Sequence, residues 1–144
     1  MSPRLARTVQ VVLVAVFLFD VALSATTFAV PELWFQAFHG NPHASEQHAF
    51  LHRCSANWAA FALIQGVALL RWRQAPWWLA VVAGVRFSDL FTDWTYLLAS
   101  PEVTPVGWMC LSLPGLGNLA IGLLMLHGYR RAMGVGAELT PSRI

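Results

Sequence analysis

The sequence predicts an all-α, polytopic membrane protein folded as an antiparallel four-helix transmembrane bundle. Of the 144 residues, 57% are apolar and only 11% are charged, whereas soluble domains carry about 25% charged residues. In addition, four apolar segments are each long enough to cross a bilayer. The composition also excludes a disordered chain, which needs high charge, and a nucleic-acid-binding domain, which needs clustered basic residues on a solvated face.

The four predicted spans cover most of the sequence. A bilayer core about 30 Å thick needs about 20 apolar residues per helix, and the segments that meet this length are residues 8–30, 50–70, 77–99 and 106–128. Prolines mark their ends, because Pro31 follows the first span, Pro76 precedes the third, and Pro101 and Pro105 separate the third from the fourth. We therefore expect residues 1–144 to form a single transmembrane domain.

The predicted outer loop, residues 31–49, is long enough to hold a short helix at the membrane interface. Apolar and polar side chains are interleaved at its start, in the order Glu32, Leu33, Trp34, Phe35, Gln36 and Phe38. This mixture is typical of a helix that lies along the interface and does not cross it.

The arginines predict the orientation of the chain. Seven of the nine basic residues fall before the first span, between the second and third, or after the fourth: Arg4, Arg7, Arg71, Arg73, Arg130, Arg131 and Arg143. Because basic loops stay in the cytoplasm, we expect a multi-pass protein of the cell inner membrane with both termini cytoplasmic.

Five charged residues fall inside the predicted spans, where an unpaired charge costs several kcal/mol. They are Asp20, Arg53, Arg86, Asp89 and Asp93. At about 100° per residue, Arg86, Asp89 and Asp93 share one stripe of the third span, and Tyr96 continues it. Counting residues from the span ends brings these groups close to one depth, together with Asn57 and Asn118.

Pairing of these charges predicts a polar centre inside the bundle. We expect Arg53 to pair with Asp93, and Arg86 to pair with Asp20 or Asp89. One carboxylate is then left over, and a buried unpaired carboxylate takes up a proton, so Asp20 or Asp89 is expected to be protonated. Such a group suits a general acid, a proton carrier or a cation site.

These residues form the predicted site. The candidate catalytic residues are Asp89, Asp20 and Asp93, and the candidate ligand-binding residues are Arg86, Arg53, Asn57, Asn118 and Tyr96. Two other interpretations stay open: the ion pairs fix helix register only, or they conduct protons or ions.

Three weaker patterns complete the site predictions. A divalent metal is one interpretation of the cluster formed by His43, Glu46, His48 and His52, although its spacing matches no metalloenzyme motif. Cys54 and Cys110 lie at equal depth, so they form either a disulfide or two separate small apolar side chains. In the fourth span, Gly115, Asn118 and Gly122 share a stripe that allows close helix packing. No motif identifies a cofactor.

The layout of the chain resembles that of the DoxX-like group of small four-span membrane proteins. The resemblance lies in the size, in the expectation that both termini are inside, and in the segment Pro31-Glu32-Leu33-Trp34 that closes the first span. It implies the four-span fold and an association with quinone-linked oxidoreductase complexes.

Three functions are consistent with the sequence. The first is binding of a hydrophobic small molecule or lipid in the polar centre, with acid/base chemistry on it by Asp89 or Asp20. The second is a non-catalytic subunit that packs against partner membrane subunits or a second copy. The third is a small proton-coupled transporter, with Asp20 as the shared site. The expected partners are thus membrane lipid, a hydrophobic ligand and other membrane chains, and no nucleic acid.

Overall fold

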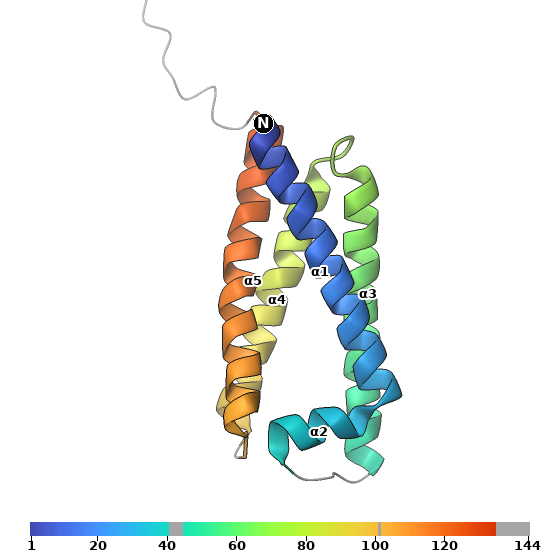
Figure 1. Ribbon diagram of the computed structural model, residues 1–144. Helices are drawn as coiled ribbons and strands as arrows, with labels where there is room; N and C mark the ends of the chain where they lie inside the picture. The colour runs from blue at the N-terminus through green and yellow to red at the C-terminus, as the bar shows by residue number, and fades with distance from the viewer. Residues whose placement is uncertain (41–44, 101, 135–144) are drawn as a thin grey trace, which may run out of the picture.

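The computed structural model describes residues 1–40, 45–100 and 102–134, and all the regular secondary structure in these residues is helical (Figure 1). The helices are α1 (Pro3–Ala29), α2 (Pro31–His39), α3 (Ser45–Arg71), α4 (Trp77–Ala99) and α5 (Pro105–Ala132). The prediction of an all-α chain is confirmed. The four predicted spans lie in α1, α3, α4 and α5, and α2 is the short helix expected after Pro31.

Two of these helices are long and apolar enough to cross a membrane by length and composition alone. They are α1 and α5. Helices α3 and α4, at 27 and 23 residues, have comparable length but carry more polar residues. In α4 the apolar sequence is interrupted by Arg86, Asp89 and Asp93, the charged residues that the sequence places on one stripe.

Capping residues and prolines begin the helices where the sequence places them. The Ser2 side chain accepts a hydrogen bond from the Leu5 backbone N–H at the start of α1, and the Thr104 side chain accepts one from Gly107 at the start of α5. A proline follows each cap, at the position where a missing N–H costs nothing. Helix α2 ends at Gly40, whose φ of 70° is a left-handed conformation that favours glycine.

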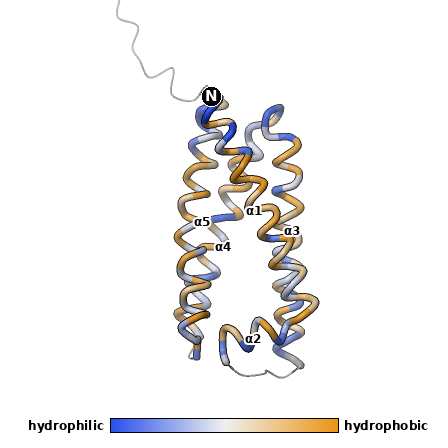
Figure 2. Tube along the Cα trace, in the orientation of Figure 1, coloured by the Kyte–Doolittle hydropathy of each residue, from blue (hydrophilic) through white to orange (hydrophobic). Residues whose placement is uncertain are grey.

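The long helices form two antiparallel pairs, α1 with α3 and α4 with α5 (Figure 1). The first residues of α1 lie at the same end of the bundle as the turn between α3 and α4 and the last residues of α5. Helix α2 crosses the opposite end. The pairs lie close together at the first end and diverge towards α2. Figure 2 shows mostly hydrophobic long helices, with hydrophilic residues at the ends and at a few interior positions.

Hydrogen bonds join α1 to α3 along their length. The Ser24 hydroxyl donates to the Ser55 backbone oxygen at 2.7 Å, and the hydroxyls of Thr27 and Ser55 lie 2.8 Å apart. Nearer the other end, the Trp72 indole N–H donates to the Gln10 side chain at 2.9 Å. These polar contacts help to hold α1 against α3.

Small residues allow close packing of α5 against α4, as predicted. Gly115 and Gly122 are buried, and a Cβ added at either would lie 2.7 Å from Trp94 or 2.5 Å from Phe87. Asn118 lies between them on the same face of α5. The glycine stripe therefore brings Asn118 within reach of the charged residues of α4.

An apolar core fills the end where the two pairs meet. Its fully buried side chains come from all four long helices: Val9, Leu13, Ala68, Trp72, Leu79, Val82, Ala83 and Met125. At the other end, α2 is tied to the segment before α5, because Thr104 donates to the backbone oxygens of Phe38, at 2.8 Å, and of Ala37, at 2.5 Å. The bundle is thus closed by packing at one end and by α2 at the other.

Substitution of single glycines tests the packing of α5 on α4. Alanine is a better helix former than glycine by about 1 kcal/mol, so Gly117→Ala, whose Cβ meets nothing within 4 Å, should raise the melting temperature slightly. Gly122→Ala should lower it, because overpacking costs about 1–3 kcal/mol. Equal melting temperatures of the two purified variants would contradict the close α4–α5 contact.

Candidate functional site

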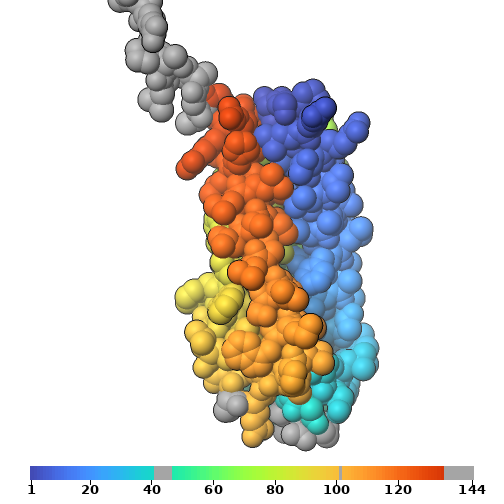
Figure 3. All heavy atoms as spheres, turned by 60° about the vertical axis from the view of Figure 1, so that its left-hand side comes forward, coloured from blue at the N-terminus to red at the C-terminus, as the bar shows by residue number. Residues whose placement is uncertain are grey.

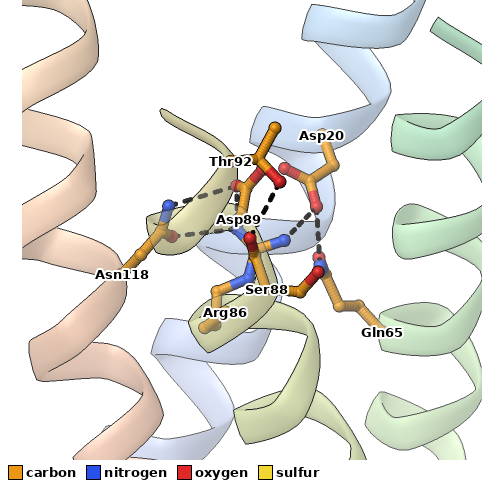
Figure 4. A network of polar contacts seen from close by, with 7 residues as sticks. All are labelled: Asp20, Gln65, Arg86, Ser88, Asp89, Thr92 and Asn118. Carbon is orange, nitrogen blue, oxygen red and sulfur yellow. Dashed lines mark hydrogen bonds and ion pairs between the residues drawn. The ribbon is translucent and has the colours of Figure 1, made fainter. Parts of the chain in front are cut away.

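The centre of the bundle is a buried ion pair between Asp20 of α1 and Arg86 of α4 (Figure 4). Arg86 Nη2 lies 2.5 Å from Asp20 Oδ2, and the side chains of Asp20 and Arg86 are 0% and 1% exposed. The same oxygen accepts a hydrogen bond from Gln65 Nε2 of α3 at 2.7 Å. The carboxylate therefore connects α1 to both α3 and α4.

The guanidinium of Arg86 also connects α4 to α5. Its Nη1 donates to Asn118 Oδ1 at 3.3 Å and lies 3.7 Å from Asp89 Oδ2. Asn118 Nδ2 in turn donates to the same Asp89 oxygen at 3.1 Å. We call Asp20, Gln65, Arg86, Asp89 and Asn118 the Arg86 network. Every long helix contributes to it, which confirms that Asp20, Arg86, Asp89 and Asn118 meet inside the bundle.

Between this network and α2, the two helix pairs diverge around two cavities. The α1/α5 cavity has a volume of about 430 Å³ and is lined by Phe19, Ala22, Leu23, Thr26, Thr27, Val30, Leu33, Trp34, Phe38, Trp58, Asp89, Asp93, Cys110, Leu111 and Pro114. Figure 3 shows the face on which α1 and α5 lie side by side. Pro114, the proline inside α5, is in this wall.

The α3/α4 cavity lies on another side of the bundle and has a volume of about 440 Å³. It is lined by Trp34, Phe35, His39, Gln47, Phe50, Leu51, Cys54, Trp58, Thr92, Asp93, Tyr96, Ser100, Glu102 and Leu111. Four residues line both cavities: Trp34, Trp58, Asp93 and Leu111. The cavities therefore adjoin at these side chains, next to the Arg86 network.

The carboxylate left without an ion-pair partner in the described residues is Asp93, and not Asp20 or Asp89 as predicted, because both of those contact Arg86. Within the part of the chain that the structure describes, the Asp93 side chain takes part in no hydrogen bond and no ion pair, and it is only half-buried. Trp34 and Trp58 line the same junction, with ring centroids 5.5 Å apart, and Trp34 stacks on Phe38 at 4.1 Å. An unpaired carboxylate thus faces two apolar cavities beside two indole rings.

Tyr96 takes its predicted place on the stripe of Arg86, Asp89 and Asp93. It lies in the wall of the α3/α4 cavity, where its hydroxyl forms a short hydrogen bond with His39 Nε2. His39 Nδ1 lies 2.6 Å from the Glu102 backbone oxygen. Tyr96 therefore helps to fix α2 across the end of the bundle.

The structure does not bring Arg53 and Asn57 into the site. Both are exposed, and the described residues contain no ion pair between Arg53 and Asp93, so that predicted pairing is wrong. The reason is helical phase: Arg53 stands two residues, or about 200°, from each of the buried residues Leu51 and Ser55. Counting residues along a helix predicts depth but not the direction of the side chain.

Gln65 and the two tryptophans of the cavity junction were missed as site residues. A signal for two of them is present in the sequence, because Leu51, Trp58 and Gln65 of α3, and Trp72 directly after it, repeat every seven residues. This repeat places them on one inward face of the helix. Trp34 has no such signal, since its position depends on how α2 docks.

The weaker predictions have separate outcomes. In the described part of the chain, no three side chains of the metal-binding types gather to hold a metal ion; His48 and His52 lie in that part, and His43 and the Glu46 side chain lie outside it. Both cysteines, Cys54 and Cys110, are free, so the disulfide interpretation is wrong.

Comparison of the chain with protein-family models, with curated proteins and with solved structures found no match.

The Arg86 network should dominate the stability of the fold. Removing one partner of a buried ion pair leaves an uncompensated charge and costs about 3–5 kcal/mol, so we expect Arg86→Gln to lower the melting temperature strongly. The matched change Arg53→Gln, at an exposed arginine, should leave the melting temperature unchanged.

A double variant tests the pairing itself. When Asp20→Asn is added to Arg86→Gln, the uncompensated carboxylate disappears, and the double variant should recover part of the lost stability. Additive losses from the two single changes would show that Asp20 and Arg86 act independently.

Proposed function

We propose that the protein is an integral membrane protein in which α1, α3, α4 and α5 all cross the bilayer. The observation that supports this proposal is the inversion of polarity in the bundle. Large apolar side chains on each long helix are exposed, such as Leu18 (57%), Leu63 (69%), Phe91 (73%) and Leu116 (56%), whereas the polar Arg86 network is buried. At about 1.5 Å per residue, even the shortest of these helices is about 35 Å long, enough for a bilayer core.

The orientation follows from the end at which the arginines gather. The start of α1, the turn between α3 and α4 and the end of α5 lie together (Figure 1), and they carry six of the seven arginines that predict the cytoplasmic side; Arg143 lies outside the described residues. We place this end in the cytoplasm and α2 at the opposite interface. The protein is then a multi-pass inner-membrane protein, and Arg53, near the α2 end of α3, reaches that interface with its long side chain.

Within this frame, we propose that the α1/α5 cavity binds a hydrophobic small molecule or a lipid. The single observation that carries the function is an apolar cavity of about 430 Å³ in which Asp89 and Asp93 are the charged groups of the wall. Ligand sites are typically concave, mostly apolar and supplied with a few polar groups that fix orientation. Asp93, which has no ion-pair partner among the described residues, is the group that would hold the polar end of the ligand.

The route of entry is from the lipid phase. Three residues of α1 in the cavity wall are exposed, namely Phe19, Ala22 and Thr26, as are Val30 directly after α1 and Cys110 of α5. In a bilayer this side of the bundle would face lipid tails. A ligand dissolved in the membrane would therefore reach Asp93 without passing through water.

The other functions expected from the sequence stay predictions. Catalysis by the carboxylates, a role as a subunit of a larger membrane complex and proton-coupled transport each require a reaction or a partner. The resemblance of the chain's layout to that of DoxX-like proteins implies the same four-span fold that we propose. Purification of the protein in mild detergent separates these functions, because a subunit would be recovered with partner chains and a pocket protein with a small ligand.

Loss of the co-purified ligand tests the proposed site. We expect mass spectrometry of the purified protein to detect a bound hydrophobic molecule, and Asp93→Asn to reduce its amount at least tenfold because the carboxylate that holds its polar end is lost. Ala22→Phe should have the same effect by filling the cavity. The control Glu32→Gln changes an exposed carboxylate outside both cavities and should retain the ligand. Equal ligand content in all four proteins would contradict the site.

Cys110 reports on the same cavity independently of the carboxylates. It is exposed and lines the α1/α5 cavity, so a bound molecule should shield its thiol. The rate at which N-ethylmaleimide modifies Cys110 is measured in a Cys54→Ser background, before and after delipidation of the protein. Delipidation should increase the rate several-fold, and an unchanged rate would place the ligand elsewhere.

A further inference from the structure

We propose that the group held at Asp93 is a cationic nitrogen, so that the ligand is a lipophilic amine or alkylammonium compound. This inference rests on the proposed function, because it requires a ligand in the α1/α5 cavity. It goes beyond that function by naming the chemical class of the ligand.

Charge balance within the bundle is the first argument. Asp20, Asp89 and Asp93 are three carboxylates, and the guanidinium of Arg86 forms ion pairs with the first two. Because Arg53 is exposed, it does not supply the second positive charge that the sequence predicts. Asp20 and Asp89 lie next to Nη2 and Nη1 of Arg86, and Asp93 receives neither a hydrogen bond nor an ion pair from the described residues. A cation on the ligand would compensate the carboxylate that the chain itself leaves without a partner.

The aromatic side chains around Asp93 are the second argument. Trp34 and Trp58 line both cavities at the point where Asp93 does, with ring centroids 5.5 Å apart and an interplanar angle of 41°. The face of an indole ring carries negative potential and attracts ammonium groups, most strongly where water is excluded. A carboxylate beside two tilted indoles is therefore a suitable environment for a substituted ammonium group, which offers both charge and apolar surface.

The lining of the α1/α5 cavity argues against an anionic ligand. No arginine or histidine is present in its described wall, and two carboxylates, Asp89 and Asp93, are. A fatty acid or a phosphate would approach these carboxylates with like charge. A phospholipid headgroup has the same difficulty, since its phosphate lies next to its nitrogen. The wall thus favours a simple amine attached directly to an apolar body.

Four probes with the same alkyl chain test the charge preference. Dodecyltrimethylammonium is cationic, 1-dodecanol is neutral, dodecylphosphocholine is zwitterionic and dodecanoate is anionic. Each is added to delipidated protein in nanodiscs of zwitterionic lipid, at concentrations that leave protein-free nanodiscs intact. Binding is followed by the melting temperature and by protection of Cys110 from N-ethylmaleimide.

We expect dodecyltrimethylammonium to bind native protein and Glu32→Gln alike, and about tenfold or more weakly to Asp93→Asn. Trp58→Leu keeps the charge and removes one ring, so it should weaken ammonium binding and leave dodecanol unaffected. This variant also keeps the test valid if Asp93→Asn does not fold.

Three results would overturn the proposal. Equal binding of dodecanol and dodecyltrimethylammonium, unchanged in Asp93→Asn, would show a purely apolar pocket and leave the proposed function standing. Equal binding of dodecylphosphocholine would assign the site to a phospholipid headgroup. Binding of none of the four probes, in a protein that also carries no ligand on purification, would overturn the proposed function together with the inference.

Discussion

The ion pair between Asp20 and Arg86 is the contact on which the rest of the bundle depends. Each helix pair is held together by its own contacts: hydroxyl groups join α1 to α3, and the glycine stripe joins α5 to α4. Between the pairs, contact is made by the apolar core at one end and by Arg86 at the centre. Because α1 and α4 meet through charged atoms at 2.5 Å, the pairs are fixed at this level and are free to diverge beyond it. The cavities lie in the space that this divergence opens, and α2 closes its end.

In the membrane location that we propose, hydrophobic packing between the helices does not offset the energetic cost of burying these charges. Lipid tails are as apolar as leucine, so four-helix association in a bilayer relies on close packing and on interhelical polar contacts. The Arg86 network supplies such contacts to every long helix. Both carboxylates of the network contact Arg86, so Asp93, at the junction of the two cavities, is left without an ion-pair partner among the described residues. The same network therefore explains both the shape of the site and the absence of an ion-pair partner for Asp93.

Much of the fold could be predicted from the sequence, and part of the site could not. Apolar length and flanking prolines predicted the long helices, and the spacing of Arg86, Asp89, Asp93 and Tyr96 predicted their shared stripe. These properties are local. The partner of Asp93 was predicted from depth alone, and Arg53 fails because the buried face of α3 runs through Leu51 and Ser55, about 200° away. The position of Trp34 depends on the docking of α2, which is a tertiary property without a periodic signal.

The most direct test of this account measures the distance between the two helix pairs. Spin labels are attached at exposed positions of α3 and α5 by Leu63→Cys and Leu116→Cys, with Cys54→Ser and Cys110→Ser to remove the native thiols. Pulsed electron paramagnetic resonance should give one narrow distance distribution in otherwise native protein and in Arg53→Gln. In Arg86→Gln the distribution should broaden, because the pairs lose their central connection. A distribution that stays narrow and unshifted in Arg86→Gln would show that the ion pair does not hold the bundle together.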